Sequence, residues 1–172
     1  MLSLLASHLT TSSLPTMLTV DWRRVADLPS QGPALGGFQD SDGGFVLNGS
    51  AIVTAFGYGS GGMPGFWLMK ITDGKSAWEP LPSAPVSGRQ EVAAAVIGDS
   101  VFYVGGFNYE SPYTYDDVLR LAADGDGGWQ WARLPSLPHR IASAGVAALG
   151  TRLYVVGGMD YDGAHFYTCV RV

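Results

Sequence analysis

The sequence contains almost no cysteine, since Cys169 is the only one among its 172 residues. A single thiol cannot form an intrachain disulfide, which argues against a small secreted domain held together by disulfides. Long apolar runs are also missing. The mildly apolar residues 1–20 lack the basic segment that begins a signal peptide. We therefore expect no membrane span and favour a cytoplasmic protein, with a weak export signal as the alternative.

Basic residues are also scarce, with 10 Lys and Arg against 15 Asp and Glu, for a net charge of −5. The only basic cluster is the pair Arg23-Arg24. A protein that neutralises phosphates along a nucleic acid carries a basic patch or stripe, and none is present. The charge pattern excludes nucleic acid as an expected partner.

One glycine motif resembles the start of a dinucleotide site. Gly57, Gly59 and Gly62 give the spacing Gly-x-Gly-x-x-Gly directly after the apolar run 51–56. A cofactor site of that kind needs a helix after the glycines, because the helix N-terminus holds the pyrophosphate. Here residues 63–65 are Met-Pro-Gly and a strand pattern follows, so we interpret the motif as a turn.

Other candidate chemical motifs are incomplete. Residues 74–76 (Gly-Lys-Ser) lack the first glycine of a phosphate loop, and residues 124–128 (Asp-Gly-Asp-Gly-Gly) lack the glutamate that ends a calcium loop. Both segments are predicted to be hairpin turns. The histidines and Cys169 do not show zinc-ligand spacing, and no Gly-x-Ser-x-Gly motif is present. We expect no cofactor and no metal.

What the sequence does contain is a repeat. Leu-Pro-Ser occurs at 28–30, 81–83 and 134–136, each 53 residues from the next. Each copy is followed by an apolar run that ends in Gly49, Gly98 or Gly150. Seven residues later come Phe56-Gly57, Gly105-Gly106 and Gly157-Gly158, and a second apolar run closes each unit at 66–71, 117–122 and 167–172. Several landmarks recur in register, so the chain is built from copies of one unit.

Within a unit the pattern is that of short strands. Residues 100–106 (SVFYVGG) and 152–158 (RLYVVGG) are β-branched and aromatic runs bounded by turn residues. The Ala-rich segments 91–98 and 143–150 are too short for helices, and we interpret them as fully buried inner strands. Each unit is therefore predicted to be a four-stranded antiparallel sheet, with strands a to d in chain order. Such a sheet buries both faces by stacking on its copies.

These landmarks resemble the Kelch repeat: a strand ending in Gly-Gly, tyrosines after it, a Trp three residues before Leu-Pro (Trp78 and Trp131), and an Arg soon after that pair. The resemblance covers about residues 22–172, and the first unit is the most degenerate copy. It implies an all-β fold, a β-propeller of Kelch type with about three four-stranded blades. The expected organisation is an N-terminal extension (1–20) and a repeat region (21–172), with units at about 27–78, 79–131 and 132–172. A strand at 21–26 would complete a blade.

Propellers typically close with about four to eight blades, so three are too few for a ring. We expect one of three situations: a part of a propeller of about six blades, a ring closed by a second copy of the chain, or an open arc on another subunit. Exposed sheet edges would make the isolated chain oligomeric or prone to aggregation.

In an up-and-down blade the d-to-a and b-to-c loops emerge on one face, so their side chains are predicted to share a rim. We expect ligand or partner contacts from this rim, with Tyr113 and His165 nearest the loop tips. Tyrosine and arginine suit recognition, although the same residues also serve blade packing in the family. The candidate residues are Arg89, Tyr109, Tyr113, His139, Arg140, Asp160, Tyr161 and His165, with Asn108, Glu110, Tyr115 and Asp162 beside them.

The resemblance implies a non-catalytic module that binds a protein partner, in some family members as the substrate-recognition part of a ubiquitin-ligase adaptor. Kelch propellers also include carbohydrate-active proteins such as sialic-acid epimerases and mutarotases. In that alternative the two arginines would hold a sugar carboxylate. A further alternative is a truncated remnant without a function of its own. Some propellers of this class hold copper, but Cys169 lies in an apolar strand run, which does not favour a metal site.

Overall fold

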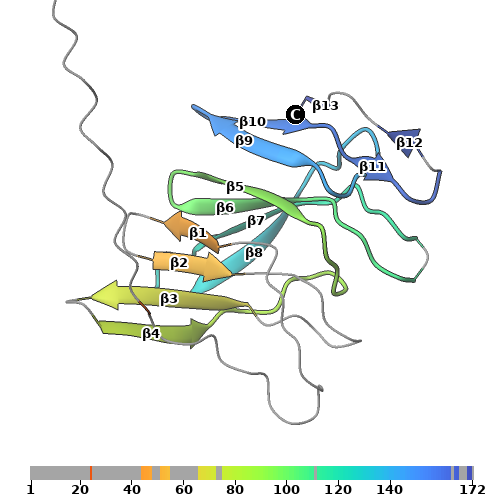
Figure 1. Ribbon diagram of the computed structural model, residues 1–172. Helices are drawn as coiled ribbons and strands as arrows, with labels where there is room; N and C mark the ends of the chain where they lie inside the picture. Colours follow the sequence, from red (N-terminus) through yellow and green to blue (C-terminus); the bar gives the residue numbers. More distant parts are fainter. Residues whose placement is uncertain are drawn as a thin grey trace, which may run out of the picture.

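The computed structural model describes residues 24, 44–47, 51–54, 66–72, 75–110, 112–163, 165–166 and 170–171. All regular secondary structure in these ranges is β-strand (Figure 1). The motif at 57–62 and Cys169 lie outside them, as does the strand predicted at 21–26 apart from Arg24, which belongs to no strand.

Three antiparallel sheets follow one another along the chain, and we call them blades 1, 2 and 3. Blade 1 has the order β1-β2-β3-β4 and blade 2 the order β5-β6-β7-β8, while the described strands of blade 3 have the order β13-β10-β9. The strands of blade 1 are β1 (Gly44–Leu47), β2 (Ala51–Thr54), β3 (Trp67–Thr72) and β4 (Lys75–Pro80). Those of blade 2 are β5 (Ala93–Ile97), β6 (Ser100–Val104), β7 (Val118–Ala123) and β8 (Trp129–Leu134). Those of blade 3 are β9 (Gly145–Leu149), β10 (Arg152–Val156) and β13 (Val170–Arg171).

The prediction of an all-β fold made of four-stranded antiparallel units is confirmed by this order. Both c-to-d segments are hairpins, with Thr72 opposite Lys75 in blade 1 and Ala123 opposite Trp129 in blade 2. One addition was not predicted. The b-to-c loop of blade 3 carries its own short hairpin, β11 (Met159–Asp160) paired with β12 (His165–Phe166).

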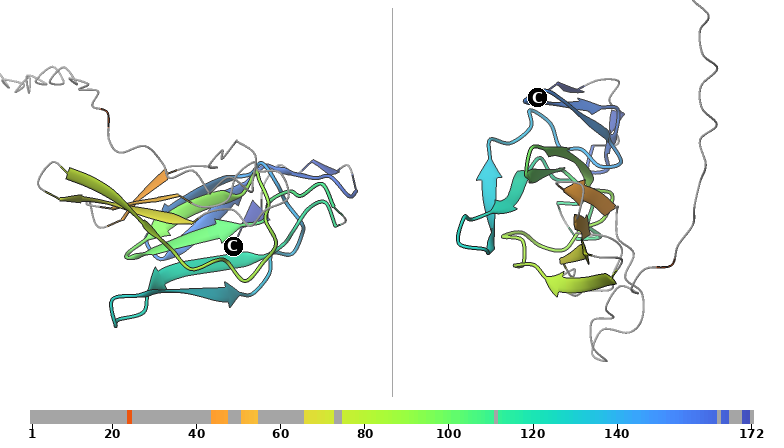
Figure 2. Two further views of the ribbon diagram at one scale, coloured as in Figure 1. Left: turned by 90° about the horizontal axis from the view of Figure 1, so that it is seen from below. Right: turned by 90° about the vertical axis from the view of Figure 1, so that its left-hand side faces the viewer.

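The blades stand side by side with their first strands toward a common axis. β5 contacts both β1 and β9, so the inner strands of successive blades are neighbours. The right-hand view of Figure 2 shows the three sheets splayed one after another. This is the arrangement of consecutive propeller blades, with each sheet stacked face to face on the next.

The interface between blades 1 and 2 is centred on Trp131 of β8. Its ring meets Phe66 edge-on, with ring centroids 5.2 Å apart, and Tyr103 at 5.4 Å. The indole Nε1–H donates to the carbonyl of Pro82 at 2.7 Å, so the polar atom of the side chain is satisfied. Pro82 belongs to the Leu-Pro-Ser copy at 81–83, so here Trp131 contacts the Leu-Pro one repeat before the copy at 134–136.

The repeated Gly-Gly pair has a backbone cause. Gly105 and Gly106 have φ of +63° and +114°, and Gly157 and Gly158 have φ of +68° and +90°, values that favour glycine. A Cβ on Gly105 would also collide with the carbonyl of Ile141, which accepts a hydrogen bond from the N–H of Gly106 at 2.8 Å. The pair therefore allows the loop after β8 to lie directly against blade 2.

The prediction that the inner strands are fully buried is wrong. In β5 only Ala95 is buried and its neighbours are half-buried, while β9 is mostly exposed, with Leu149 at 71%. An inner strand is buried only where further blades cover its face and close the axis. Blade 3 has blade 2 on one side, and its other face is open to solvent at Val156, which is 53% exposed.

Val104 and Val156 provide a matched test of this arrangement, because both end a b strand two residues before the second glycine of the Gly-Gly pair. Val104 is 1% exposed, in a cluster with Ile141 and Val155 that joins blades 2 and 3, whereas Val156 is 53% exposed. We expect Val104→Ala to lower the free energy of unfolding by about 2 kcal/mol and Val156→Ala by less than about 0.5 kcal/mol. Chemical denaturation measures both, and equal losses would contradict the assigned interface.

Candidate functional site

The d-to-a and b-to-c loops lie together at one end of the blades, toward the right in Figure 1. Gln90 and Phe107 bond each other through both backbone groups, at 2.8 and 2.7 Å, and Ala142 and Met159 do the same at 2.9 and 3.0 Å. Each pair joins a d-to-a loop to the b-to-c loop of the same blade. The predicted rim is therefore present as a set of hydrogen-bonded loops.

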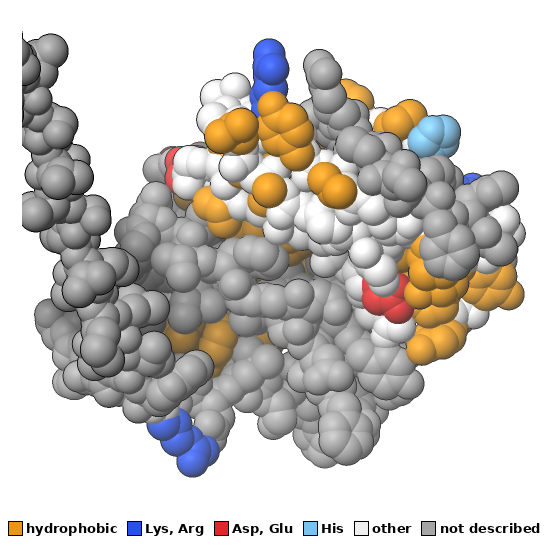
Figure 3. Space-filling model, turned by 45° about the horizontal axis from the view of Figure 1, so that its top comes forward, with side chains coloured by type: hydrophobic (Ala, Val, Ile, Leu, Met, Phe, Trp, Pro, Cys, Tyr) orange, Lys and Arg blue, Asp and Glu red, His pale blue; other side chains and the backbone are white. Residues whose placement is uncertain are grey.

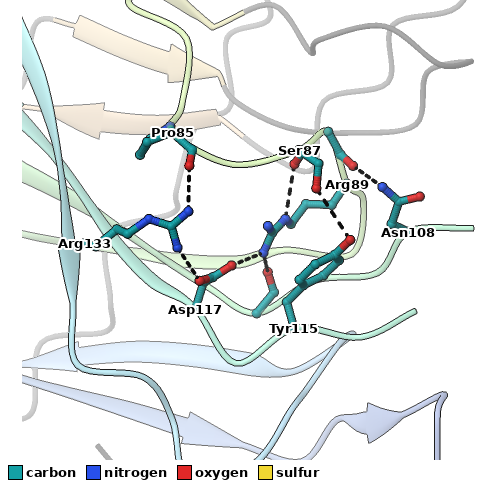
Figure 4. Close-up of polar contacts among 9 residues, drawn as sticks. Pro85, Ser87, Arg89, Asn108, Tyr115, Asp117 and Arg133 are labelled. Carbon is teal, nitrogen blue, oxygen red and sulfur yellow. Dashed lines mark hydrogen bonds and ion pairs between the residues drawn. The ribbon is translucent and has the colours of Figure 1, made fainter. Parts of the chain in front are cut away.

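Arg89 lies beneath this rim, with its side chain only 2% exposed (Figure 4). Its Nη1 donates to Asp117 Oδ2 at 2.9 Å and to the carbonyl of Gly105 at 3.3 Å. The guanidinium carbon also lies 3.7 Å from the centre of the Tyr115 ring. Burial lowers the pKa of Arg89, and the hydrogen bond and charge of Asp117 act against that shift. Arg89 thus fixes the loops of blade 2 from within.

Asp117 also forms an ion pair with a second arginine, Arg133. Arg133 Nη1 lies 2.8 Å from Asp117 Oδ1, and Arg133 Nη2 donates to the carbonyl of Pro85 at 2.6 Å. The Arg133 side chain is 55% exposed. One carboxylate therefore joins strand β8, the start of β7 and the 81–92 loop.

Three aromatic side chains of the rim loops contact one another. Phe107 packs between two tyrosines, with ring centroids 4.9 Å from Tyr109 and 4.5 Å from Tyr161. Tyr109 is 65% exposed and Tyr161 is 37% exposed, so both tyrosines present part of their side chains to solvent. We call Phe107, Tyr109 and Tyr161 the aromatic shelf.

Glu91 borders the aromatic shelf. Its Oε2 accepts hydrogen bonds from Ser143 Oγ at 2.6 Å and from Tyr161 Oη at 3.0 Å, which links blade 2 to blade 3. Burial of Tyr161 and its hydrogen bond to Glu91 raise the pKa of the Tyr161 hydroxyl. Glu91 and Ser143 occupy equivalent places before β5 and β9, and both have a positive φ, of 57° and 52°.

Asp162 connects the two b-to-c loops. Its carboxylate accepts the N–H groups of Tyr113 at 3.1 Å and Thr114 at 2.9 Å, and Arg140 Nη1 lies 3.6 Å away. Thr114 is fully buried and its Oγ1 accepts the N–H of Tyr161 at 2.8 Å. Partial burial acts to raise the pKa of Asp162, but the two N–H groups and Arg140 outweigh it, so the pKa lies below its usual value.

The structure brings most of the predicted residues to this rim. Tyr113 is 43% exposed, and His139 and Arg140 are exposed on the 135–144 loop. Asp160 accepts the N–H of Asp162 at 3.0 Å within the hairpin of blade 3. Asn108 donates to the carbonyl of Gly88, and its Oδ1 accepts the N–H of Glu110. The backbone of His165 pairs with Asp160 in β12.

Comparison with known proteins gives several Kelch-like relatives, although no family model matches the sequence. The chain is 31% identical over 98 residues to Kelch-like protein terF of Aspergillus terreus and 33% identical over 78 residues to Kelch-like protein 36 of Bos taurus. These matches cover 54% and 44% of this chain and only 21% and 12% of those proteins. Kelch-like protein 35 of Mus musculus is 24% identical over 127 residues, with 51% of this chain and 22% of that protein covered.

Among solved structures, the structure of YjhT superposes with a TM-score of 0.58 at 20% sequence identity. The superposition covers 70% of this chain and 35% of that one. The repeats in the sequence, the stacked blades and these relatives agree. The chain is similar to Kelch-repeat proteins. It has the β-propeller fold and spans about a third or less of the proteins that it matches.

Several residues of the rim were not predicted as candidates: Phe107, Glu91, Ser143 and Thr114. A comparison of repeat positions could have selected Glu91 and Ser143, which lie at the same place in two units. Thr114 carried no such signal, because its importance comes from an inter-blade hydrogen bond that the sequence does not reveal.

The rim has features of a recognition surface. Its exposed tyrosines are supported by a backbone that the Gln90–Phe107 bridge, Asp117 and Asp162 hold in place. Among the described residues, no group of three or more His, Cys, Asp and Glu side chains could hold a metal ion. A search of the same residues found no helix long and apolar enough to cross a membrane.

Removal of Asp117 is expected to destabilise the fold strongly. Asp117→Ala leaves the buried Arg89 without its carboxylate, which typically costs about 3 kcal/mol or more. Arg133→Ala removes an exposed partner of the same carboxylate and is expected to cost less than about 1 kcal/mol. Denaturant unfolding of the two variants checks this, and a small loss in Asp117→Ala would show that Arg89 does not depend on the pair.

Asp162→Ala is expected to lower the free energy of unfolding by about 1–2 kcal/mol near neutral pH, because the N–H of Thr114 loses its acceptor. A carboxylate with a depressed pKa stabilises the fold above its usual value of 3.8, and this contribution is lost as pH falls through the lower folded value. Urea unfolding of both proteins at a series of pH values checks this. The difference should shrink below about pH 3.8, and a constant difference down to low pH would contradict the assigned charge. Asp126→Ala, in an exposed hairpin, serves as the control.

Proposed function

We propose that this Kelch chain is a non-catalytic protein-interaction module that binds its partner through the rim formed by the d-to-a and b-to-c loops. The observation that carries the proposal is the exposure of Tyr109, Tyr113 and Tyr161 on one hydrogen-bonded surface. Tyrosine contributes a large contact area with little loss of side-chain entropy, and it is enriched among residues that dominate binding energy. The Kelch-like names of the relatives support the same class of function.

The finer form of the proposal is that the chain is the substrate-recognition part of a ubiquitin-ligase adaptor. It requires that ubiquitin-ligase subunits co-purify with the full-length protein. The placement of Arg89 does not favour the carbohydrate alternative. Its buried guanidinium is already occupied by Asp117 and Gly105, so only Arg140 of the two arginines is exposed to an anionic sugar.

The experiment compares proteins recovered from a lysate of the source organism by the wild-type chain and by two variants. Tyr109→Ala combined with Tyr113→Ala removes exposed aromatic area from the rim. Leu149→Ala removes exposed apolar area at the opposite end of blade 3 and is the matched control. We expect the same proteins to be recovered by wild type and control, and recovery to fall about tenfold or more with the rim variant.

Equal recovery by the rim variant and the wild type would contradict a rim-based interaction. Saturable binding of sialic acid that is lost in Arg140→Ala would replace the proposal with the carbohydrate alternative. Circular dichroism of each variant establishes that the fold is retained.

A further inference from the structure

The aromatic shelf has a carboxylate at its border without a cationic partner. Within the part of the chain that the structure describes, both hydrogen bonds to the Glu91 carboxylate go to Oε2 and come from uncharged hydroxyl groups. The ion pairs of this region use other carboxylates, Asp117 with Arg89 and Arg133, and Asp162 with Arg140. Glu91 is therefore a negative charge beside exposed aromatic rings, with no basic side chain of this region bound to it.

The backbone at Glu91 is unusual as well. Its φ of 57° lies in the left-handed region, where residues other than glycine, asparagine and aspartate are uncommon. Glycine would adopt this conformation with less strain but would bring no carboxylate to the shelf. Backbone strain of this kind persists where the surrounding structure enforces it, and it gathers at binding and switch sites.

The rim as a whole is also negatively charged, like Glu91. The loops 81–92, 105–117, 135–144 and 157–163 contain six carboxylates and two arginines. Figure 3 shows an acidic side chain next to a group of hydrophobic side chains on this part of the surface. An acidic field of this kind attracts cationic partners and repels anionic ones.

We infer that the aromatic shelf and Glu91 form a binding site for an arginine or lysine side chain of a protein partner. Tyr109 and Tyr161 provide ring faces that attract a cation, and the carboxylate of Glu91 accepts its N–H groups. Gln90, whose amide lies 3.4 Å from the Tyr109 hydroxyl, helps to orient that ring. This inference rests on the proposed function and adds the chemistry of the residue that is recognised.

The test is a titration of the full-length, ¹⁵N-labelled chain with N-acetyl-arginine amide, followed by NMR. N-acetyl-citrulline amide has nearly the same shape without the charge and is the matched probe. We expect saturable shifts of the amide signals of Phe107, Tyr109 and Tyr161 with the arginine probe, and about tenfold weaker binding of the citrulline probe.

Two variants separate a specific site from general attraction. Glu91→Gln keeps a hydrogen-bond acceptor for Ser143 and Tyr161 but removes the charge, and we expect it to weaken binding of the arginine probe about tenfold. Glu110→Gln removes the same charge from an exposed part of the rim and is expected to bind like the wild type. Glu91→Gly relieves the positive φ, and we expect this variant to remain folded and to lose binding.

Equal binding of the arginine and citrulline probes would overturn the inference, as would equal losses in Glu91→Gln and Glu110→Gln. Shifts of the same signals caused by glucose and unchanged in Glu91→Gln would assign the shelf to a neutral sugar instead. Failure of this inference can be distinguished from failure of the proposed function. Partner recovery that depends on Tyr109 and Tyr113 but not on Glu91 would support rim binding and reject a basic anchor.

Discussion

The structure depends on the packing of each small sheet against the next. A four-stranded sheet of strands four to six residues long cannot bury both of its faces alone, so its stability comes from its neighbours. The Trp131 contact with Phe66 and Tyr103 provides this between blades 1 and 2. Val104, Ile141 and Val155 provide it between blades 2 and 3. Where no described sheet follows, the same kind of apolar face is exposed.

Stacking also determines where function can reside. Because the blades share an orientation, equivalent loops from successive blades meet at one rim, and side chains far apart in sequence become neighbours. Glu91 and Tyr161 are 70 residues apart and share a hydrogen bond. Asp162 accepts the backbone N–H groups of Tyr113 and Thr114, which lie 49 and 48 residues before it in the chain. The polar contacts at the rim therefore serve two purposes, since they join the blades and hold the exposed aromatic side chains in place.

The repeat made the fold predictable. The landmarks have structural causes: Trp131 donates to the carbonyl of Pro82, and both described Gly-Gly pairs have a positive φ. The burial of the inner strands was predicted wrongly, because burial depends on how many blades surround a strand. At the rim, the sequence selected Tyr109, Tyr113 and Tyr161 from their loops but did not predict that Arg89 would be buried against Asp117. Ion pairing and the positive φ of Glu91 arise from three-dimensional contacts that residue types do not specify.

The central claim is that successive sequence units stack as consecutive blades around one axis. Nuclear Overhauser effects on the purified chain test it most directly. The account predicts contacts between the indole protons of Trp131 and the ring of Phe66, and between the amide of Ser143 and the α-proton of Glu91. Their absence, or sequential amide contacts typical of a helix over residues 93–97, would contradict the stacked blades and the rim that they form.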